Sequence, residues 1–88
     1  MLTQTITVVN PTGIHARPAA LLVNQAKKLT SEITISEDDK TVPMKSVINL
    51  LGMGLECNDV VTISANGADE QEAIQSLKDL FQSFAAHD

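Results

Sequence analysis

The chain has 88 residues, a length that allows one domain with a single modest core. Its composition, 43% hydrophobic and 19% charged, is typical of a folded globular protein and excludes an intrinsically disordered chain. The formal net charge of −5 argues against direct binding to nucleic acid or anionic lipid, because the surface as a whole repels their phosphates.

Targeting, membrane-spanning and metal-binding signals are not found in the sequence. The first ten residues lack the basic start and long apolar run of a signal peptide, and no segment approaches the ~20 apolar residues of a membrane span. Cys57 is the only cysteine, so no internal disulfide can form, and no ligand spacing supports a metal site. We expect one domain over residues 1–88, cytoplasmic, with no metal.

The first half of the chain predicts a strand, a helix and a hairpin. Residues 2–9 alternate, with a threonine at every second position, which indicates a half-buried strand. Residues 16–28 carry a small, apolar stripe at helical spacing. Residues 31–37 alternate again, and residues 41–43 form a short partner strand that ends at a proline.

The second half predicts a short helix, a strand and a last helix. Residues 46–51 are a short apolar helix candidate, followed by glycines that interrupt the chain. Residues 60–65 form the fourth strand, and Asp69 with Glu72 three residues later resembles a capping box. The order β-α-β-β-α-β-α predicts an α+β fold in two layers, with four mainly antiparallel strands and the helices on one face.

The segment TGIHARPAA, residues 12–20, places a histidine at a predicted helix start. If the helix begins at Ala16, His15 is its N-cap, and Pro18 is tolerated as the third residue because first-turn N–H groups have no intrahelical acceptor. The positive end of the helix dipole disfavours an imidazolium and favours a bound anion. A neutral His15 could then act as a nucleophile for a phosphoryl group that Arg17 holds. The alternative is an ordinary surface histidine, since histidine is not a preferred N-cap.

The same segment resembles the phosphorylation-site signature of HPr, the histidine-containing phosphocarrier family of the bacterial sugar phosphotransferase system. The resemblance covers essentially the whole chain. It continues through Met44-Lys45-Ser46 and the apolar run behind it, through Met53-Gly54-Leu55, and through residues 60–70. It implies an open-faced β-sandwich with the element order that the periodicities also predict.

The resemblance implies a role for each matching residue. His15 would accept a phosphoryl group from enzyme I through Nδ1 and donate it to a sugar-specific enzyme IIA. Arg17 would stabilise the phosphoryl group, and Pro18 would shape the helix start. Ser46 would be the target of an HPr kinase/phosphorylase, and a phosphate there would hinder phosphorylation of His15 by repulsion. Some members keep this serine without the kinase, and a plain N-cap is the alternative for Ser46.

An apolar patch around His15 is the predicted docking surface for partner proteins. The helix at residues 46–51 is too short to turn all its apolar side chains to the core, although each of them taken singly could still cap the core. The predicted partner-binding residues are Ala20, Leu21, Asn24, Lys27, Val47, Ile48 and Leu51, with Lys45 and Asn49 also in the polar rim. Asn49 and Gly52 depart from the glycine and serine of Gram-positive members, which bears on recognition by the kinase.

We therefore expect a phosphocarrier with no turnover of a small substrate and no cofactor. Its partners would be enzyme I, enzyme IIA and, where they exist, the kinase and a catabolite-control repressor, and we expect a monomer. The alternative is a regulatory binding module, in which the Ser46-phosphorylated form acts mainly as a corepressor. The known paralogue of that kind lacks the active histidine, whereas His15 is present here. A small-molecule sensor would share only the fold class. Cys57 has no assigned role, and His87 is expected to be an exposed bystander.

Overall fold

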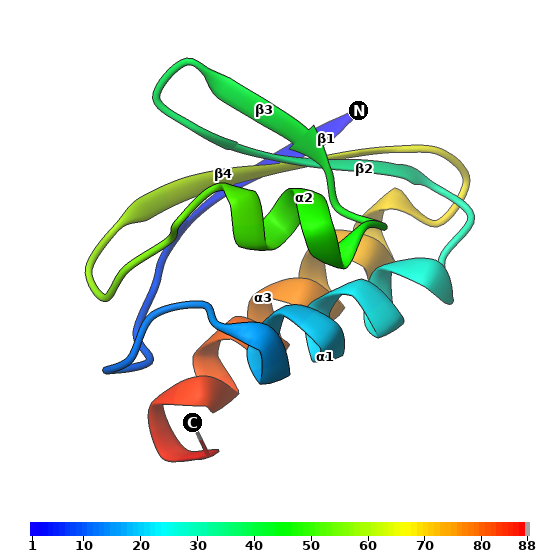
Figure 1. The fold of residues 1–88 in the computed structure, drawn as a ribbon. Coiled ribbons are helices and arrows are strands. Elements are labelled where there is room, and N and C mark those ends of the chain that lie inside the picture. The colour runs from blue at the N-terminus through cyan, green and yellow to red at the C-terminus, as the bar shows by residue number, and fades with distance from the viewer. Residues whose placement is uncertain (88) are drawn as a thin grey trace.

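The computed structural model describes residues 1–87, with side chains through Ala85. The elements are β1 (Leu2–Thr7), α1 (Ala16–Lys27), β2 (Glu32–Glu37), β3 (Lys40–Pro43), α2 (Val47–Gly52), β4 (Val60–Asn66) and α3 (Glu70–His87). The four strands form one sheet in the order β1-β4-β2-β3, and every neighbouring pair is antiparallel. The three helices lie on one side of this sheet and leave the other side open (Figure 1). The predicted fold, an open-faced two-layer β-sandwich, is confirmed.

The alternation in the strands separates the core from the open face of the sheet. The inward positions of β2 and β4 hold buried apolar side chains such as Ile35 and Ile63, and in β1 Ile6 is buried while Leu2 and Gln4 are half-buried. The outward positions of β1 hold threonines that are exposed. Helices α1 and α3 close the core with stripes at helical spacing. The fully buried side chains of the strands and helices include Leu22, Val23, Ile33, Ile35, Val61, Ile63, Leu77 and Phe81. In the described residues, no helix has the length and apolar character needed to cross a membrane.

Strand β1 is shorter than predicted and ends at Thr7 instead of Val9. Beyond Thr7 the backbone of Val8 still bonds to the chain beside it, because its N–H donates to the carbonyl of Asp59 and its carbonyl accepts from Asn58, both at 2.8 Å. The left-handed conformation of Asn58, with φ of 76°, turns that neighbouring chain away. Regular pairing therefore stops, while Val8 remains fully buried in the core.

The predicted capping box is right about where α3 begins and wrong about its partners. The carbonyl of Asp69 accepts from Ala73 N at 2.9 Å, so Asp69 precedes the first turn of α3. Its carboxylate, however, accepts from the N–H groups of Thr30 at 2.8 Å and Ser31 at 2.9 Å and from the Ser31 hydroxyl. Glu70 reaches back in place of Glu72, with Oε1 accepting from Gly67 N at 3.2 Å. Asp69 thus joins the start of α3 to the entry of β2.

Stability should depend on the charge of Asp69 at acid pH. The hydrogen bonds from the Ser31 side chain and the Thr30 backbone lower the pKa of Asp69 from 3.8 to about 2. Between those two values the unfolded chain binds more protons than the folded one, so the stability that this carboxylate contributes is present above about pH 4 and lost as the pH falls towards 2.

We expect Asp69→Asn to lower the urea midpoint at neutral pH, because an amide is a weaker acceptor for these donors. The difference from the unmodified protein should shrink as the pH falls through this window. Urea unfolding followed by circular dichroism at several pH values measures it. Asp79→Asn is the matched control, since Asp79 is exposed on the same helix. A difference that stays constant down to about pH 2 would contradict the assignment.

Candidate functional site

The loop that joins β1 to α1 is held against the loop that joins α2 to β4. Ile14 is buried, and its N–H donates to the carbonyl of Leu55 at 2.9 Å. Gly13 has φ of +75°, and a Cβ at this position would lie 2.6 Å from the Leu55 carbonyl oxygen. Only glycine fits this close approach of two backbones. The chain therefore reaches His15 from a fixed backbone conformation.

The second of these loops is itself tied to the sheet. The N–H of Glu56 donates to the carboxylate of Asp59 at 2.8 Å, and the N–H of Asp59 donates to the Glu56 carbonyl at 3.0 Å. At the end of β2, burial and a side-chain hydrogen bond to Asp59 raise the pKa of Glu37. Hydrogen bonds within this loop and the contact with the end of β2 therefore support the carbonyl to which Ile14 is bound.

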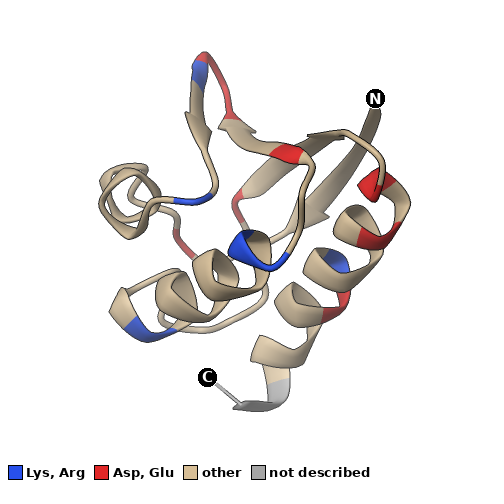
Figure 2. Ribbon diagram, turned by 90° about the vertical axis from the view of Figure 1, so that its right-hand side faces the viewer, with Lys and Arg blue, Asp and Glu red and all other residues tan. Residues whose placement is uncertain are grey.

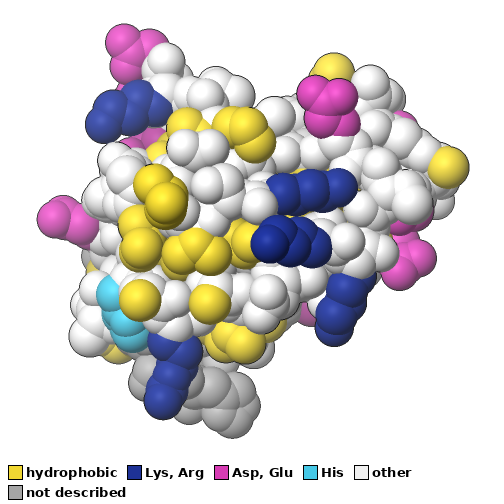
Figure 3. Space-filling model, turned by 45° about the vertical axis from the view of Figure 1, so that its right-hand side comes forward, with side chains coloured by type: hydrophobic (Ala, Val, Ile, Leu, Met, Phe, Trp, Pro, Cys, Tyr) yellow, Lys and Arg dark blue, Asp and Glu magenta, His cyan; other side chains and the backbone are white. Residues whose placement is uncertain are grey.

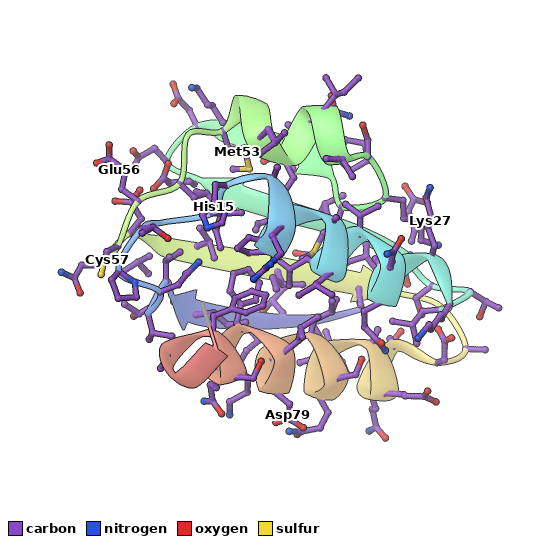
Figure 4. The ribbon with its side chains drawn as sticks, turned by 60° about the horizontal axis from the view of Figure 1, so that its bottom comes forward. His15, Lys27, Met53, Glu56, Cys57 and Asp79 are labelled. Carbon is purple, nitrogen blue, oxygen red and sulfur yellow. The ribbon has the colours of Figure 1, made fainter. Side chains whose placement is uncertain are left out.

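His15 is the N-cap residue of α1, as predicted, but its ring does not serve as the cap. The backbone of His15 is extended, with φ of −99° and ψ of −166°, and its carbonyl accepts from Ala19 N at 3.0 Å. The side chain makes no capping hydrogen bond to the helix, and the residue is exposed. Figure 4 shows His15 at the same end of the molecule as Met53, Glu56 and Cys57, with Lys27 at the other end of α1.

The surroundings of His15 favour a bound anion. The first turn of α1 has no acidic residue, so no carboxylate of the helix itself compensates the positive end of its dipole. Arg17 is exposed in that turn, and Pro18 is buried as the third helical residue, as predicted. Figure 2 shows basic residues and no acidic ones on α1, whereas α3 carries acidic residues near its start. Helix dipole and arginine can each contribute on the order of 1 kcal/mol to an anion held here.

The predicted apolar docking residues form one patch across α1 and α2, which contact each other. We use "apolar patch" for Ala20, Leu21, Val47, Ile48 and Leu51. Exposure is 46% for Leu21, 38% for Leu51 and 82% for Ile48, so these side chains do not merely close the core. Ala20 and Val47 are half-buried, and Val47 packs against the core. Figure 3 shows hydrophobic side chains gathered beside the cyan histidine, with basic side chains at the margins.

Three of the four residues predicted for the polar rim are exposed, and the fourth is half-buried. Asn24, Lys27 and Asn49 are exposed, as a rim requires. Lys45 is half-buried, and its ammonium donates to the carbonyl of Leu29 at 2.9 Å, just past the end of α1. A cation at that point also complements the negative end of the helix dipole. Lys45 therefore joins the start of α2 to the end of α1 and is less exposed than the other three residues.

Ser46 is the N-cap residue of α2, and its hydroxyl accepts from Asn49 N at 3.3 Å. The structural role that was left open for this serine is therefore present. Cys57 is half-buried in the loop before β4. In the described residues, no group of three or more His, Cys, Asp or Glu side chains lies close enough to hold a metal ion. The expectation for His87 lies outside the described side chains.

Sequence reasoning did not find the contact between Gly13 and Leu55. Leu55 contributes through its backbone carbonyl, and a carbonyl is present at every residue, so no pattern of side chains points to it. A glycine two residues before the histidine was the one available signal, because a glycine can mark a close approach of two backbones.

A family model of the HPr component of the phosphotransferase system, described as its phosphorylation site, matches residues 2–83. The chain belongs to the HPr family. Phosphocarrier protein HPr of Buchnera aphidicola subsp. Baizongia pistaciae is 46% identical over 77 residues, which are 88% of this chain and 91% of that protein. The family resemblance seen in the sequence and the phosphocarrier role that it implied are confirmed.

Solved structures of HPr-like proteins share the fold. The crystal structure of HPr-C-His from Thermoanaerobacter tengcongensis matches with a TM-score of 0.94 and 43% identity, covering 100% of this chain and 99% of that one. Crh, the Bacillus subtilis catabolite repression protein, was crystallised as a swapped dimer and matches with a TM-score of 0.76 and 38% identity, covering 96% and 97% of the two chains.

Proposed function

We propose that His15 carries the phosphoryl group, taking it from phospho-enzyme I and passing it to a sugar-specific enzyme IIA. The observation that supports this most directly is an exposed histidine at the start of a helix whose first turn holds Arg17 and no acid. The lone pair of Nδ1 forms the N–P bond as the bond between phosphorus and the donor breaks. On delivery to enzyme IIA the same bond breaks, and Nδ1 regains its lone pair.

The proposal is tested by incubating the protein with enzyme I and phosphoenolpyruvate. We expect one phosphoryl group per chain, labile to acid and stable to base, and located on His15 by peptide mapping. Adding an enzyme IIA should discharge it. An acid-stable adduct, or one mapped to another residue, would contradict the assignment of His15.

We propose that Arg17 and the N–H groups of the first turn stabilise the phosphoryl group during transfer. Negative charge on its oxygens meets the guanidinium and the positive end of α1. Pro18 removes an N–H that would have no helical acceptor and fixes the backbone of the first turn. The attraction is modest because the site is exposed, which suits a group that must be passed on.

Arg17→Ala should slow transfer by about 5-fold, since the guanidinium at this exposed site contributes on the order of 1 kcal/mol. Stability should change little, because Arg17 is exposed. Single-turnover transfer from phospho-enzyme I measures the rate. Lys28→Ala, which removes an exposed cation just after α1, is the matched control for net charge. Equal slowing of the two variants would remove Arg17 from the mechanism.

We propose that the apolar patch and its rim of Asn24, Lys27 and Asn49 dock both enzyme I and enzyme IIA. Both partners must bring a reacting group to His15, so both have to approach the same face of α1 and α2. The patch combines exposed aliphatic side chains with a polar margin, the composition typical of transient interfaces. We also propose that the protein acts as a monomer in the cytoplasm, although Crh was crystallised as a dimer.

Ile48→Lys tests the patch. At 82% exposure this side chain can be replaced without a core penalty, and a charge there should raise the KM of enzyme I for the protein about 10-fold while kcat changes little. Steady-state kinetics with enzyme I measures the two constants separately. Val60→Lys is the matched control, since Val60 is a 54% exposed valine in β4, outside the patch. An unchanged KM would show that enzyme I docks elsewhere.

We propose Ser46 as a regulatory phosphorylation site. Ser46 directly precedes Val47 and Ile48 in the chain. A phosphate on its hydroxyl would therefore place about two negative charges at the edge of the apolar patch and hinder docking of enzyme I. Treatment with an HPr kinase, followed by the enzyme I assay, tests this. The alternative function, a Ser46-phosphorylated corepressor, draws some support from the similarity to Crh. The exposed His15 favours the phosphocarrier as the main role.

A further inference from the structure

Asn10 is a buried polar residue that the phosphocarrier role has not yet explained. Among the described residues only Asn10 and Ser31 are polar and buried, both at 0% exposure. Ser31 is accounted for by its bonds to Asp69. Asn10 lies between β1 and α1, five positions before His15, in a turn that is otherwise exposed at Pro11 and Thr12. A buried amide is unfavourable unless it makes hydrogen bonds, so the bonds of this side chain matter.

Asn10 makes two hydrogen bonds to Gly13. Its backbone carbonyl accepts from Gly13 N at 3.0 Å, and its side-chain Nδ2 donates to the Gly13 carbonyl. In the described residues no donor reaches Oδ1, so the side chain acts through Nδ2. The exposed turn is therefore closed at its base by one residue.

These bonds fix the peptide group between Gly13 and Ile14 from both sides. Its carbonyl is bound by Asn10 Nδ2, and its N–H donates to the Leu55 carbonyl at 2.9 Å. A peptide group is planar, so binding both its ends removes its freedom to rotate. The next peptide group along the chain leads into His15, the first residue whose carbonyl enters the hydrogen bonds of α1.

We propose that Asn10 is a positioning residue for phosphoryl transfer, whose side-chain N–H orients the Gly13–Ile14 peptide and thereby places His15 at the start of α1. The inference rests on the proposed role of His15. In this proposal Asn10 acts through the Gly13–Ile14 peptide. Its effect arises because in-line transfer is sensitive to displacements of the nucleophile of about 1 Å, which can change a rate about 100-fold.

Asn10→Ala is the direct test. We expect faster hydrogen exchange of the Ile14 N–H, by about 10-fold or more relative to core amides such as Ile63, and kcat in the enzyme I assay lower by about 10- to 100-fold. KM should stay within about 2-fold, because the apolar patch is untouched. Ser31→Ala is the matched control: it removes the other buried polar side chain, at the far end of α1 from His15, and should leave Ile14 exchange and kcat as they are at equal folded fraction.

Asn10→Asp separates the effect of the side-chain hydrogen bond to Gly13 from the effect of side-chain volume. The aspartic acid has the shape of asparagine and can donate to the Gly13 carbonyl only while its carboxyl is protonated. At each pH the Ile14 exchange rate and kcat of Asn10→Asp are compared with those of Asn10→Ala and of the unmodified protein. At low pH the aspartate variant should resemble the unmodified protein, and as the pH rises it should come to resemble Asn10→Ala.

Unchanged Ile14 exchange in Asn10→Ala, or an unchanged kcat in a folded variant, would overturn the inference. So would equal pH profiles for the alanine and aspartate variants. Failure of the unmodified protein to accept a phosphoryl group on His15 would instead overturn the proposed function. The exchange measurement would still report whether Asn10 holds the peptide in place.

Discussion

His15→Ala should abolish phosphorylation by enzyme I while the protein stays folded. The expected loss is complete, because in the proposed mechanism the side chain supplies the nitrogen that forms the N–P bond and a methyl group cannot replace it. Stability should change by less than about 1 kcal/mol, since the residue is exposed and helix α1 is started by the His15 backbone, whose carbonyl accepts from Ala19 N at 3.0 Å. Mass spectrometry under neutral conditions and urea unfolding measure the two effects.

Comparison with Arg17→Ala sharpens this test. Both residues are exposed at the same helix start, so both variants alter the same surface. Removing the nucleophile should abolish the adduct, whereas removing the guanidinium should only delay it. An acid-labile adduct that persists in His15→Ala would show that another residue carries the phosphoryl group. Full transfer activity in both variants would rule out the start of α1 as the site.

Gly13→Ala should lower the free energy of unfolding by about 2–4 kcal/mol and slow phosphoryl transfer as well. An alanine at φ of +75° is strained by about 1–2 kcal/mol. The new Cβ would also lie 2.6 Å from the Leu55 carbonyl oxygen, which is backbone and cannot turn aside. Relief of this contact would lengthen the hydrogen bond from Ile14 N to the same carbonyl, now 2.9 Å, and move the chain that leads to His15.

Gly54→Ala is the matched control for backbone strain. Gly54 also has positive φ, +63°, but its Cβ would meet nothing within 4 Å. This variant should therefore show the strain alone, a loss of about 1–2 kcal/mol. Urea unfolding and single-turnover transfer compare the two variants. Equal losses of stability would mean that the close contact with the Leu55 carbonyl does not contribute to the effect of Gly13→Ala. An unchanged transfer rate in a folded Gly13→Ala protein would show that this contact does not position His15.

The elements and their faces could be predicted from the sequence because they depend on local periodicity. A period of two with β-branched residues indicates a half-buried strand wherever it occurs, and Ile33, Ile35 and Ile63 are fully or nearly fully buried as that period requires. The start of α1 was predictable for a similar reason. Pro18 and the turn residues before His15 restrict the backbone within a few residues of the helix start. Element ends were less certain, as Thr7 shows, because they depend on the neighbouring chain.

The candidate site could be predicted only as far as the chemistry of its own residues. That His15 and Arg17 suit a phosphoryl group follows from side-chain type and helix polarity. A six-residue helix cannot bury every apolar side chain, so the sequence predicts that some of those in α2 are exposed. It does not show that Ile48 is the most exposed of them. The hydrogen bond from Lys45 to the carbonyl of Leu29, just past the end of α1, was not predictable from the sequence.

Tertiary structure alone decided the contacts between loops. The carboxylate of Asp69 binds Thr30 and Ser31, which lie 39 and 38 positions earlier, and Gly13 meets the carbonyl of Leu55. Backbone N–H and carbonyl groups are the same at nearly every residue, so side-chain patterns cannot indicate which of them will meet. The sequence by itself determined which elements form and which residue we propose as the phosphoryl carrier. The packing of two distant loops decided where the chain holds that residue, because only the folded chain brings their backbones together.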